Sequence, residues 1–148
     1  MPKDFVMRGQ TASGQTEVLN FSGFKPGYAY KLTEFALYPS QSVQGANDEL
    51  IGTVTAGKTA VDPANPNFND EGLIATTLFK IYSSTAYAPN GLSVVNDKYL
   101  ITQNLILMVQ NADSGTPVNW QCKFEAVKMN KAEEAVTNYK QFLISDDG

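Results

Sequence analysis

Histidine is absent from this 148-residue sequence, and cysteine occurs once, as Cys122. Without histidine the chain lacks the commonest general base and the commonest metal ligand, so a Ser-His-Asp or Cys-His catalytic group is impossible. A single cysteine cannot form an internal disulfide or, by itself, supply a zinc site. We therefore expect a protein that is not an enzyme, holds no cofactor or metal, and works by binding.

Charged residues are also few. They make up 18% of the chain, with 11 basic and 15 acidic residues and a formal net charge of −4. Nucleic-acid binding depends on neutralising phosphates with lysine and arginine, and here the basic residues are scattered without a run or stripe. We expect no direct contact with nucleic acid. A chain with little charge often covers part of its surface with another subunit, because association favours uncharged and aromatic surface.

Long hydrophobic runs are missing too. The longest strongly apolar run, Leu105 to Val109, is far too short to span a bilayer. The first residues lack the apolar core of a signal peptide. We expect a protein without a membrane partner that is made in the cytoplasm and stays soluble, or leaves inside a larger particle.

The sequence does contain many short segments rich in Val, Ile, Thr, Tyr and Phe, separated by Gly and Pro. This spacing is typical of an all-β sandwich or barrel, and 148 residues suit a single domain over residues 1–148. We predict an antiparallel, jelly-roll-like β-sandwich of seven or eight strands. The strands are expected near residues 4–9, 15–21, 28–38, 49–56, 72–82, 99–110 and 117–129, with a further short strand possible at 92–96.

Three of these segments carry more specific patterns. Residues 117–129 alternate strictly, which predicts one buried and one wet face. The second half of 99–110 is apolar on both faces, with Ile106 and Met108 opposite the leucines, and 72–82 behaves in the same way. Such strands need a second cover, which could be a helix, a loop or a neighbouring subunit.

Two local irregularities are predicted. In 28–38 the apolar face changes register in the middle, so we expect a β-bulge at Thr33-Glu34; otherwise Glu34 points inward and needs a partner. The residues Asp113 to Thr116 form a hairpin signal, and they should join the last two long strands as antiparallel neighbours.

Both ends of the chain are predicted to serve association. Residues 1–15 read as an extended arm, whose deletion over 2–12 should leave the melting temperature nearly unchanged. Asn130 followed by Glu133 signals a helix start, and the spacing of apolar residues after it predicts one short amphipathic helix over 131–142. The residues expected at interaction surfaces are Phe5, Val6, Met7, Ile106, Met108, Val136 and Tyr139.

The candidates for chemistry are weak. The oxygen-rich loop at 62–71 lacks EF-hand spacing and is best interpreted as a series of Asx turns, although its ion binding stays open. Cys122, on an apolar strand face, is interpreted as a small buried hydrophobe. Carboxylate pairs for glycoside hydrolysis could come from Glu34, Asp48, Glu49 or Asp70, but no spacing brings two of them together.

A resemblance adds to this interpretation. A short, acidic, β-rich chain without histidine and with Thr11-Ala12-Ser13-Gly14-Gln15 near its start resembles the small virion proteins of tailed phages. The run from Leu100 to Asn111, a hairpin, and the run from Val118 to Val127 look like the closing strands of a jelly roll. Jelly-roll domains are common among capsid and capsid-decorating (cement) proteins, which are often trimers.

The resemblance implies a virion structural protein that is located in the virion and forms a homotrimer or another homo-oligomer. Its further partner would be the major capsid protein or another virion protein. The alternative is a carbohydrate-binding β-sandwich, for example a receptor-binding or fibre-associated domain. That module would use exposed aromatic residues such as Tyr38, Tyr82 and Tyr87, with polar groups from the 62–70 loop.

Overall fold

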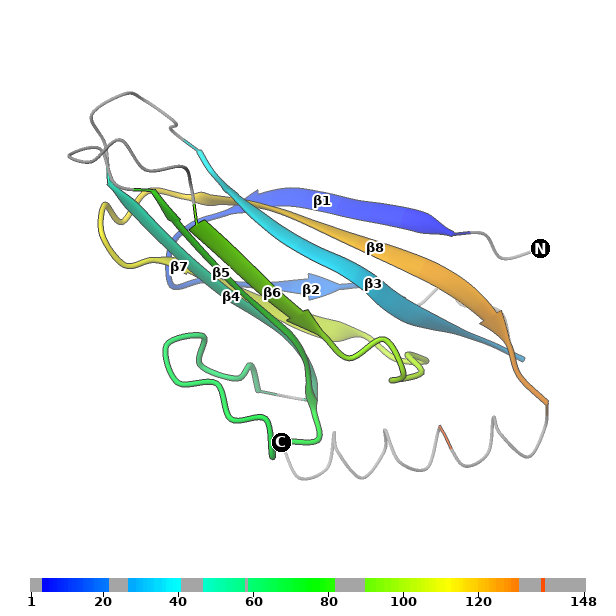
Figure 1. Ribbon diagram of the computed structural model, residues 1–148. Helices are drawn as coiled ribbons and strands as arrows, with labels where there is room; N and C mark the ends of the chain where they lie inside the picture. Colours follow the sequence, from blue (N-terminus) through cyan, green and yellow to red (C-terminus); the bar gives the residue numbers. More distant parts are fainter. Residues whose placement is uncertain are drawn as a thin grey trace.

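The computed structural model describes residues 4–21, 27–40, 47–57, 59–81, 90–130 and Thr137. Eight strands form two antiparallel sheets packed face to face (Figure 1). The small sheet has the order β1-β8-β3 and the large sheet the order β2-β7-β4-β5-β6. The strands are β1 (Phe5–Thr11), β2 (Thr16–Leu19), β3 (Tyr28–Pro39), β4 (Asp48–Ala56), β5 (Leu73–Ile81), β6 (Asn90–Val95), β7 (Leu105–Asn111) and β8 (Val118–Lys128).

The strand pairing is nested, as in a jelly roll. β1 pairs with β8, β2 with β7, and β4 with β5, so that the two halves of the chain fold over each other. β6 departs from this scheme, because it extends the large sheet beside β5 instead of pairing with β3. The predicted antiparallel β-sandwich of seven or eight strands is confirmed, and the possible strand at 92–96 is β6.

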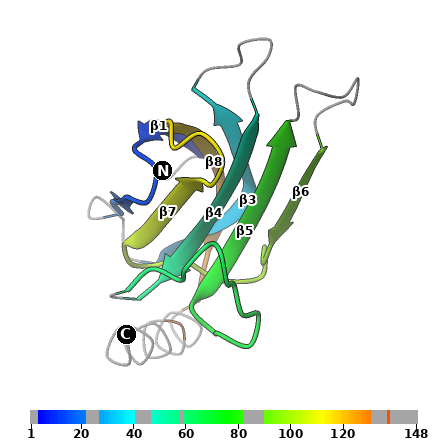
Figure 2. The ribbon, with the colours of Figure 1, turned by 90° about the vertical axis from the view of Figure 1, so that its left-hand side faces the viewer.

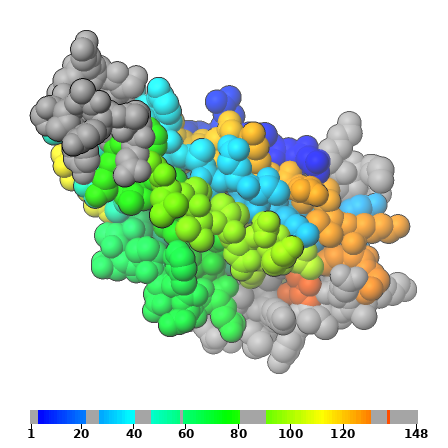
Figure 3. Space-filling model, in the orientation of Figure 1, coloured from blue at the N-terminus to red at the C-terminus, as the bar shows by residue number. Residues whose placement is uncertain are grey.

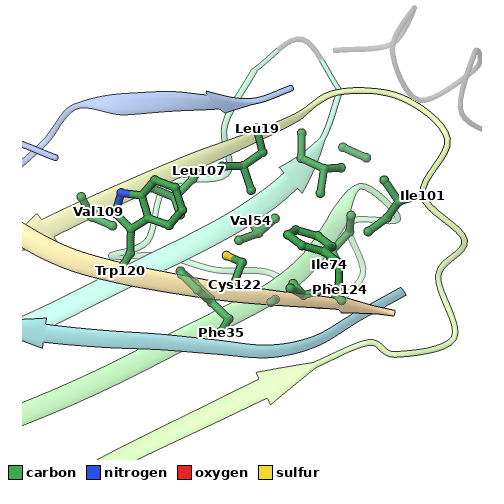
Figure 4. Packing of buried hydrophobic residues seen from close by; sticks show 14 of the residues in the cluster. Leu19, Phe35, Val54, Ile74, Ile101, Leu107, Val109, Trp120, Cys122 and Phe124 are labelled. Atoms are coloured by element: carbon green, nitrogen blue, oxygen red, sulfur yellow. The ribbon is translucent and has the colours of Figure 1, made fainter. Parts of the chain in front are cut away.

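The core lies between the sheets and follows the predicted alternation of β8. Val118, Trp120, Cys122 and Phe124 are all buried, and the residues between them face outward. Figure 4 shows Trp120, Cys122 and Phe124 directed at the large sheet. Their partners there, which come from β7, β4 and the start of β5, include Leu107, Val54 and Ile74.

The bulge predicted in β3 is confirmed. The register between β3 and β8 shifts between Leu32 and Glu34, so Leu32 and Phe35 both face the core. Glu34 points outward, where its carboxylate lies 3.4 Å from Nζ of Lys123 and accepts a hydrogen bond from Nε2 of Gln121 at 3.1 Å. The bulge therefore removes the need for a buried partner for Glu34.

The predicted hairpin between the last two long strands is wrong. β7 lies between β2 and β4 in the large sheet, whereas β8 lies between β1 and β3 in the small sheet. The segment 112–117 is therefore an arch that crosses from one sheet to the other. Each strand has one buried face, and the two faces meet across the core.

Asn111 at the end of β7 shapes this arch. Its Nδ2 donates to Oδ1 of the buried Asp48 at 2.8 Å and to Oγ of Ser114 at 2.8 Å. Its Oδ1 accepts from the backbone N–H groups of Asp113 and Ser114, each at 3.2 Å. The side chain thus closes an Asx-type turn while it ties the arch to the start of β4.

The segment predicted as a strand over 99–110 is only partly one. β7 starts at Leu105, and the preceding residues run beside β3. There the backbone groups of Ile101 and Tyr30 exchange two hydrogen bonds, of 2.9 and 2.7 Å. Asn104 uses its side-chain oxygen to accept from the N–H of Phe21 at 2.6 Å, which explains why regular pairing is interrupted before Leu105.

The strand predicted near residues 4–9 is confirmed as β1, so these residues belong to the small sheet as well as to the segment predicted as an arm. Phe5 to Thr11 pair with β8 residue by residue, and Phe5 and Met7 pack against the core. The ring of Phe5 stacks on that of Phe124 at a centroid distance of 5.1 Å. The helix predicted over 131–142 lies outside the described residues, except for Thr137, which is helical.

Candidate functional site

The two outer faces of the sandwich differ in chemistry. On the small sheet, the outward side chains of β8 are Asn119, Gln121, Lys123 and Glu125. Their cross-strand neighbours include Arg8 and Gln10 on β1 and Lys31 and Glu34 on β3. This face is polar and charged, as expected of a surface that stays in water.

The outer face of the large sheet carries more aliphatic side chains, which alternate with threonines. Cross-strand pairs place Leu78 beside Ile51 and Leu92, and Ile106 beside Val18. Several of these side chains are well exposed, with 62% of Val18 and 67% of Leu92 open to solvent. We call this surface the apolar outer face; its aliphatic residues are Val18, Ile51, Leu78, Leu92, Val94, Ile106 and Met108.

The middle of the apolar outer face is covered by the chain itself. The loop 57–72 leaves β4 on the side away from the small sheet (Figure 1). Oγ1 of Thr53 donates to the carbonyl of Val61 at 2.7 Å, and the N–H of Val61 donates to Oγ1 of Thr55 at 3.1 Å. Thr53 and Thr55 are consequently buried although they point outward. The loop thus covers the end of β4 on this face.

The charges on the apolar outer face are confined to one end. Glu49 and Lys80 are cross-strand neighbours there, and their charged atoms are 3.4 Å apart. Because this pair is partly exposed, it contributes little to stability. The rest of the face offers aliphatic and threonine side chains, which suit contact with another protein surface.

The residues predicted at interaction surfaces fall into different places. Ile106 and Met108 lie half-buried on the apolar outer face. Val6 is exposed, but it lies on the polar outer face beside Lys123. Phe5 and Met7 are half-buried and pack against the core. Val136 and Tyr139 lie outside the described residues.

Sequence reasoning missed Val18, Leu92 and Val94 as members of this face. β2 and β6 are short edge strands, and an alternating pattern over so few residues does not tell which apolar side chain faces the core. The available signal was the two-sided apolar character of 72–82, which correctly put Leu78 opposite the core side. Ile74 lies four residues before Leu78 on β5 but is buried, because the β4–β5 register shifts beside it.

The oxygen-rich loop consists of Asx turns, as interpreted. Carboxylate or amide oxygens of Asp62, Asn67 and Asp70 each accept from the backbone N–H two residues further on, at 2.9, 3.0 and 2.9 Å. Within the described part of the chain, no group of three or more His, Cys, Asp or Glu residues could hold a metal ion.

Cys122 is a buried thiol. Its side chain is fully enclosed, and burial, with a smaller contribution from the negative charge of Glu34, raises its pKa from 9.0 to about 12. A thiol with this pKa stays protonated at neutral pH and is a poor nucleophile. The interpretation of Cys122 as a small core hydrophobe is confirmed.

The aromatic residues proposed for sugar binding are only partly described. Tyr38 is exposed, and its ring lies 6.3 Å from that of Phe79, as measured between centroids. Tyr82 and Tyr87 lie outside the described residues. The carbohydrate alternative therefore stays a prediction, and a glycan array would test it.

No protein-family model matches the sequence, and no curated protein matches it significantly. Among the described residues, no helix is long and apolar enough to cross a bilayer.

Proposed function

We propose that the protein is a non-enzymatic virion structural protein of the capsid-decoration kind, which associates with itself and binds a larger protein shell. The observation that carries the proposal is the contrast between the polar outer face and the apolar outer face. Exposed aliphatic side chains lie near both edges of the large sheet, on β2, β5 and β6. They favour a protein contact, because covering them releases water from apolar surface. The jelly-roll-like pairing supports the same class of protein.

A decoration protein of this kind acts by mass action. A subunit that binds only the assembled shell stabilises the shell by its binding free energy. Stabilising a shell by binding needs no reactive group. The described residues provide an apolar surface for such a contact. In this proposal the apolar outer face lies on the shell and the polar outer face remains in water.

The test is co-sedimentation of the purified protein with particles encoded by the same genome, from which this protein has first been removed. Val18→Lys places a charge on the apolar outer face and should weaken binding at least about tenfold, because an unpaired charge would be buried in the contact. Val6→Lys is the matched control, since Val6 is also an exposed valine on an edge strand but lies on the polar outer face. Equal loss in both variants, or no binding by the unmodified protein, would contradict the proposal.

A further inference from the structure

The edge strands of the sandwich are β1 and β3 in the small sheet and β2 and β6 in the large sheet. Exposed edges tend to pair with other chains, and proteins protect them with charges, proline or bulges. β1 carries Arg8, β2 carries Glu17, and β3 has the bulge between Leu32 and Glu34. β6 (Asn90–Val95) contains no charged residue and no proline, and its ladder with β5 runs without a register shift.

The edge of β6 is open to solvent. Residues 91–94 are exposed, with 67% of Leu92 and 42% of Val94 open to solvent. Figure 2 shows β6 at the end of the large sheet, and Figure 3 shows it in yellow-green along the surface beside β3. Within the described ranges no strand pairs with its outer side. The nearest link to β3 is a side-chain hydrogen bond of 2.9 Å from Oγ of Ser93 to the carbonyl of Phe35.

The backbone direction of β6 can be read from its end. The N–H of Asn96 donates to the carbonyl of Ile74 at 2.8 Å, so the backbone groups of Asn96 face β5. Because these groups alternate along a strand, those of Leu92 and Val94 also face β5. The N–H and C=O groups of residues 91, 93 and 95 consequently point to the free edge.

We propose that β6 pairs antiparallel with β6 of a second copy, around a two-fold axis at Ser93. In this register Ser93 lies opposite Ser93 of the second copy, and Gly91 lies opposite its Val95. All three outward-pointing residues then exchange backbone hydrogen bonds, which is the most that this strand can make across its free edge. The large sheets of the two copies would become one continuous sheet.

The side chains favour a second copy as the occupant. On the apolar outer face, this register sets Leu92 opposite Val94 of the second copy, and the two-fold axis repeats the pair in the other direction. Such cross-strand aliphatic pairs stabilise an antiparallel ladder. The strand is thus complementary to itself, as a closed two-fold interface requires. This predicts a dimer in place of the trimer that the phage resemblance implies.

The inference rests on the self-association in the proposed function, and it is tested without any shell. Light scattering coupled to size exclusion should give twice the chain mass of 16.1 kDa. Leu92→Lys should raise the dimer dissociation constant at least about tenfold. In the dimer each lysine would lie opposite Val94 of the other copy, so that two lysines would replace aliphatic contacts and repel each other. Val18→Lys is the matched control, since Val18 is 62% exposed on the other edge of the same sheet, and it should remain dimeric.

Disulfide trapping tests the register. When Leu92→Cys and Val94→Cys variants are mixed and oxidised, the two cysteines should cross-link, because opposite residues in such a pair lie about 4.5 Å apart between Cα atoms. Each variant alone should cross-link much less, since identical residues would be about 8 Å apart, beyond disulfide reach. Cys122 is fully buried and does not interfere.

Several results would overturn the inference. They are a monomer or a trimer in solution, a dimer that Leu92→Lys leaves intact, and cross-linking that does not depend on mixing the two variants. Circular dichroism of each variant checks folding, and Val94→Lys provides a second charge on the same strand if Leu92→Lys does not fold. A dimer that fails to bind particles would contradict only the shell proposal, so the two failures are distinguishable.

Discussion

At the scale of single residues, Asn111 controls how the chain crosses between the sheets. Replacing it with alanine leaves the buried carboxylate of Asp48 and three backbone N–H groups without this partner. We expect Asn111→Ala to lower the free energy of unfolding by about 2–4 kcal/mol, as measured by urea denaturation. Asn119→Ala is the control, because Asn119 is half-buried on the polar outer face, and it should cost less than about 1 kcal/mol. Equal costs would show that the arch does not depend on Asn111.

Gly9 makes room for the indole ring of Trp120. A Cβ atom at position 9 would lie 2.7 Å from Cζ2 of that ring. The ring cannot turn freely, because its Nε1 donates to Oγ1 of Thr11 at 2.9 Å. We expect Gly9→Ala to destabilise the fold by about 1–3 kcal/mol and to shift the tryptophan fluorescence. Gln10→Ala, at an exposed neighbouring position, should change neither.

From the buried thiol of Cys122 we predict that the free energy of unfolding falls at alkaline pH. Its pKa in the fold, about 12, lies above the ordinary value of 9.0, so folding favours the protonated thiol. This contribution is complete below pH 9 and is lost as the pH rises toward 12. Burial raises the pKa of Tyr99 from 10.0 to about 12 and adds to the same trend. Melting temperatures measured from about pH 8 to pH 11 should fall, and less steeply for Cys122→Ala. An equal slope in both proteins would contradict this assignment.

At the scale of elements, β1 changes the expectation for the N-terminus. Phe5 packs among the rings of Phe21, Tyr30 and Phe124, with centroid distances of 5.9, 5.1 and 5.1 Å. Deleting residues 2–12 removes these contacts and exposes an edge of β8. We now expect the deletion to lower the melting temperature by about 10 °C or more, as followed by circular dichroism. An unchanged melting temperature would show that residues 2–12 are dispensable for folding, as first predicted for an extended arm.

The elements that sequence reasoning predicted well are those with long patterns. β8 and β3 are long enough for alternation to define the buried face, and the break in the β3 pattern located the bulge. The partners of each strand were harder to predict, because the local turn signal at residues 113–116 suits both a hairpin and an arch. The packing of whole sheets decides between them, and it is not encoded in any one segment.

The candidate site shows the same limit. The two-sided apolar character of the β7 segment pointed correctly to Ile106 and Met108 as outward residues needing a cover. It did not reveal that the loop 57–72 would cover Thr53 and Thr55, or that β2 and β6 would extend the face. These facts depend on contacts between segments far apart in the chain. Phe5 and Met7 were misplaced because a short apolar run suits an arm as well as a strand.

At the scale of the whole molecule, the protein is a sandwich with a polar outer face, an apolar outer face and one unprotected edge strand. Each feature has a separate proposed role, in solvation, shell binding and pairing of copies. The variants Val6→Lys, Val18→Lys and Leu92→Lys place the same charge on these three regions in turn. We expect Val6→Lys to keep both activities and Val18→Lys to lose particle binding while staying dimeric. Leu92 belongs both to the apolar outer face and to the unprotected edge, so Leu92→Lys should lose dimerisation and also bind particles more weakly.

The most direct test of the central claim is a cryo-electron microscopy reconstruction of particles encoded by the same genome. We predict density for the β-sandwich at regular positions on the shell, with the apolar outer face against the shell and the polar outer face toward solvent. Well-resolved particles that carry no such density, or that hold the sandwich by its polar outer face, would contradict it.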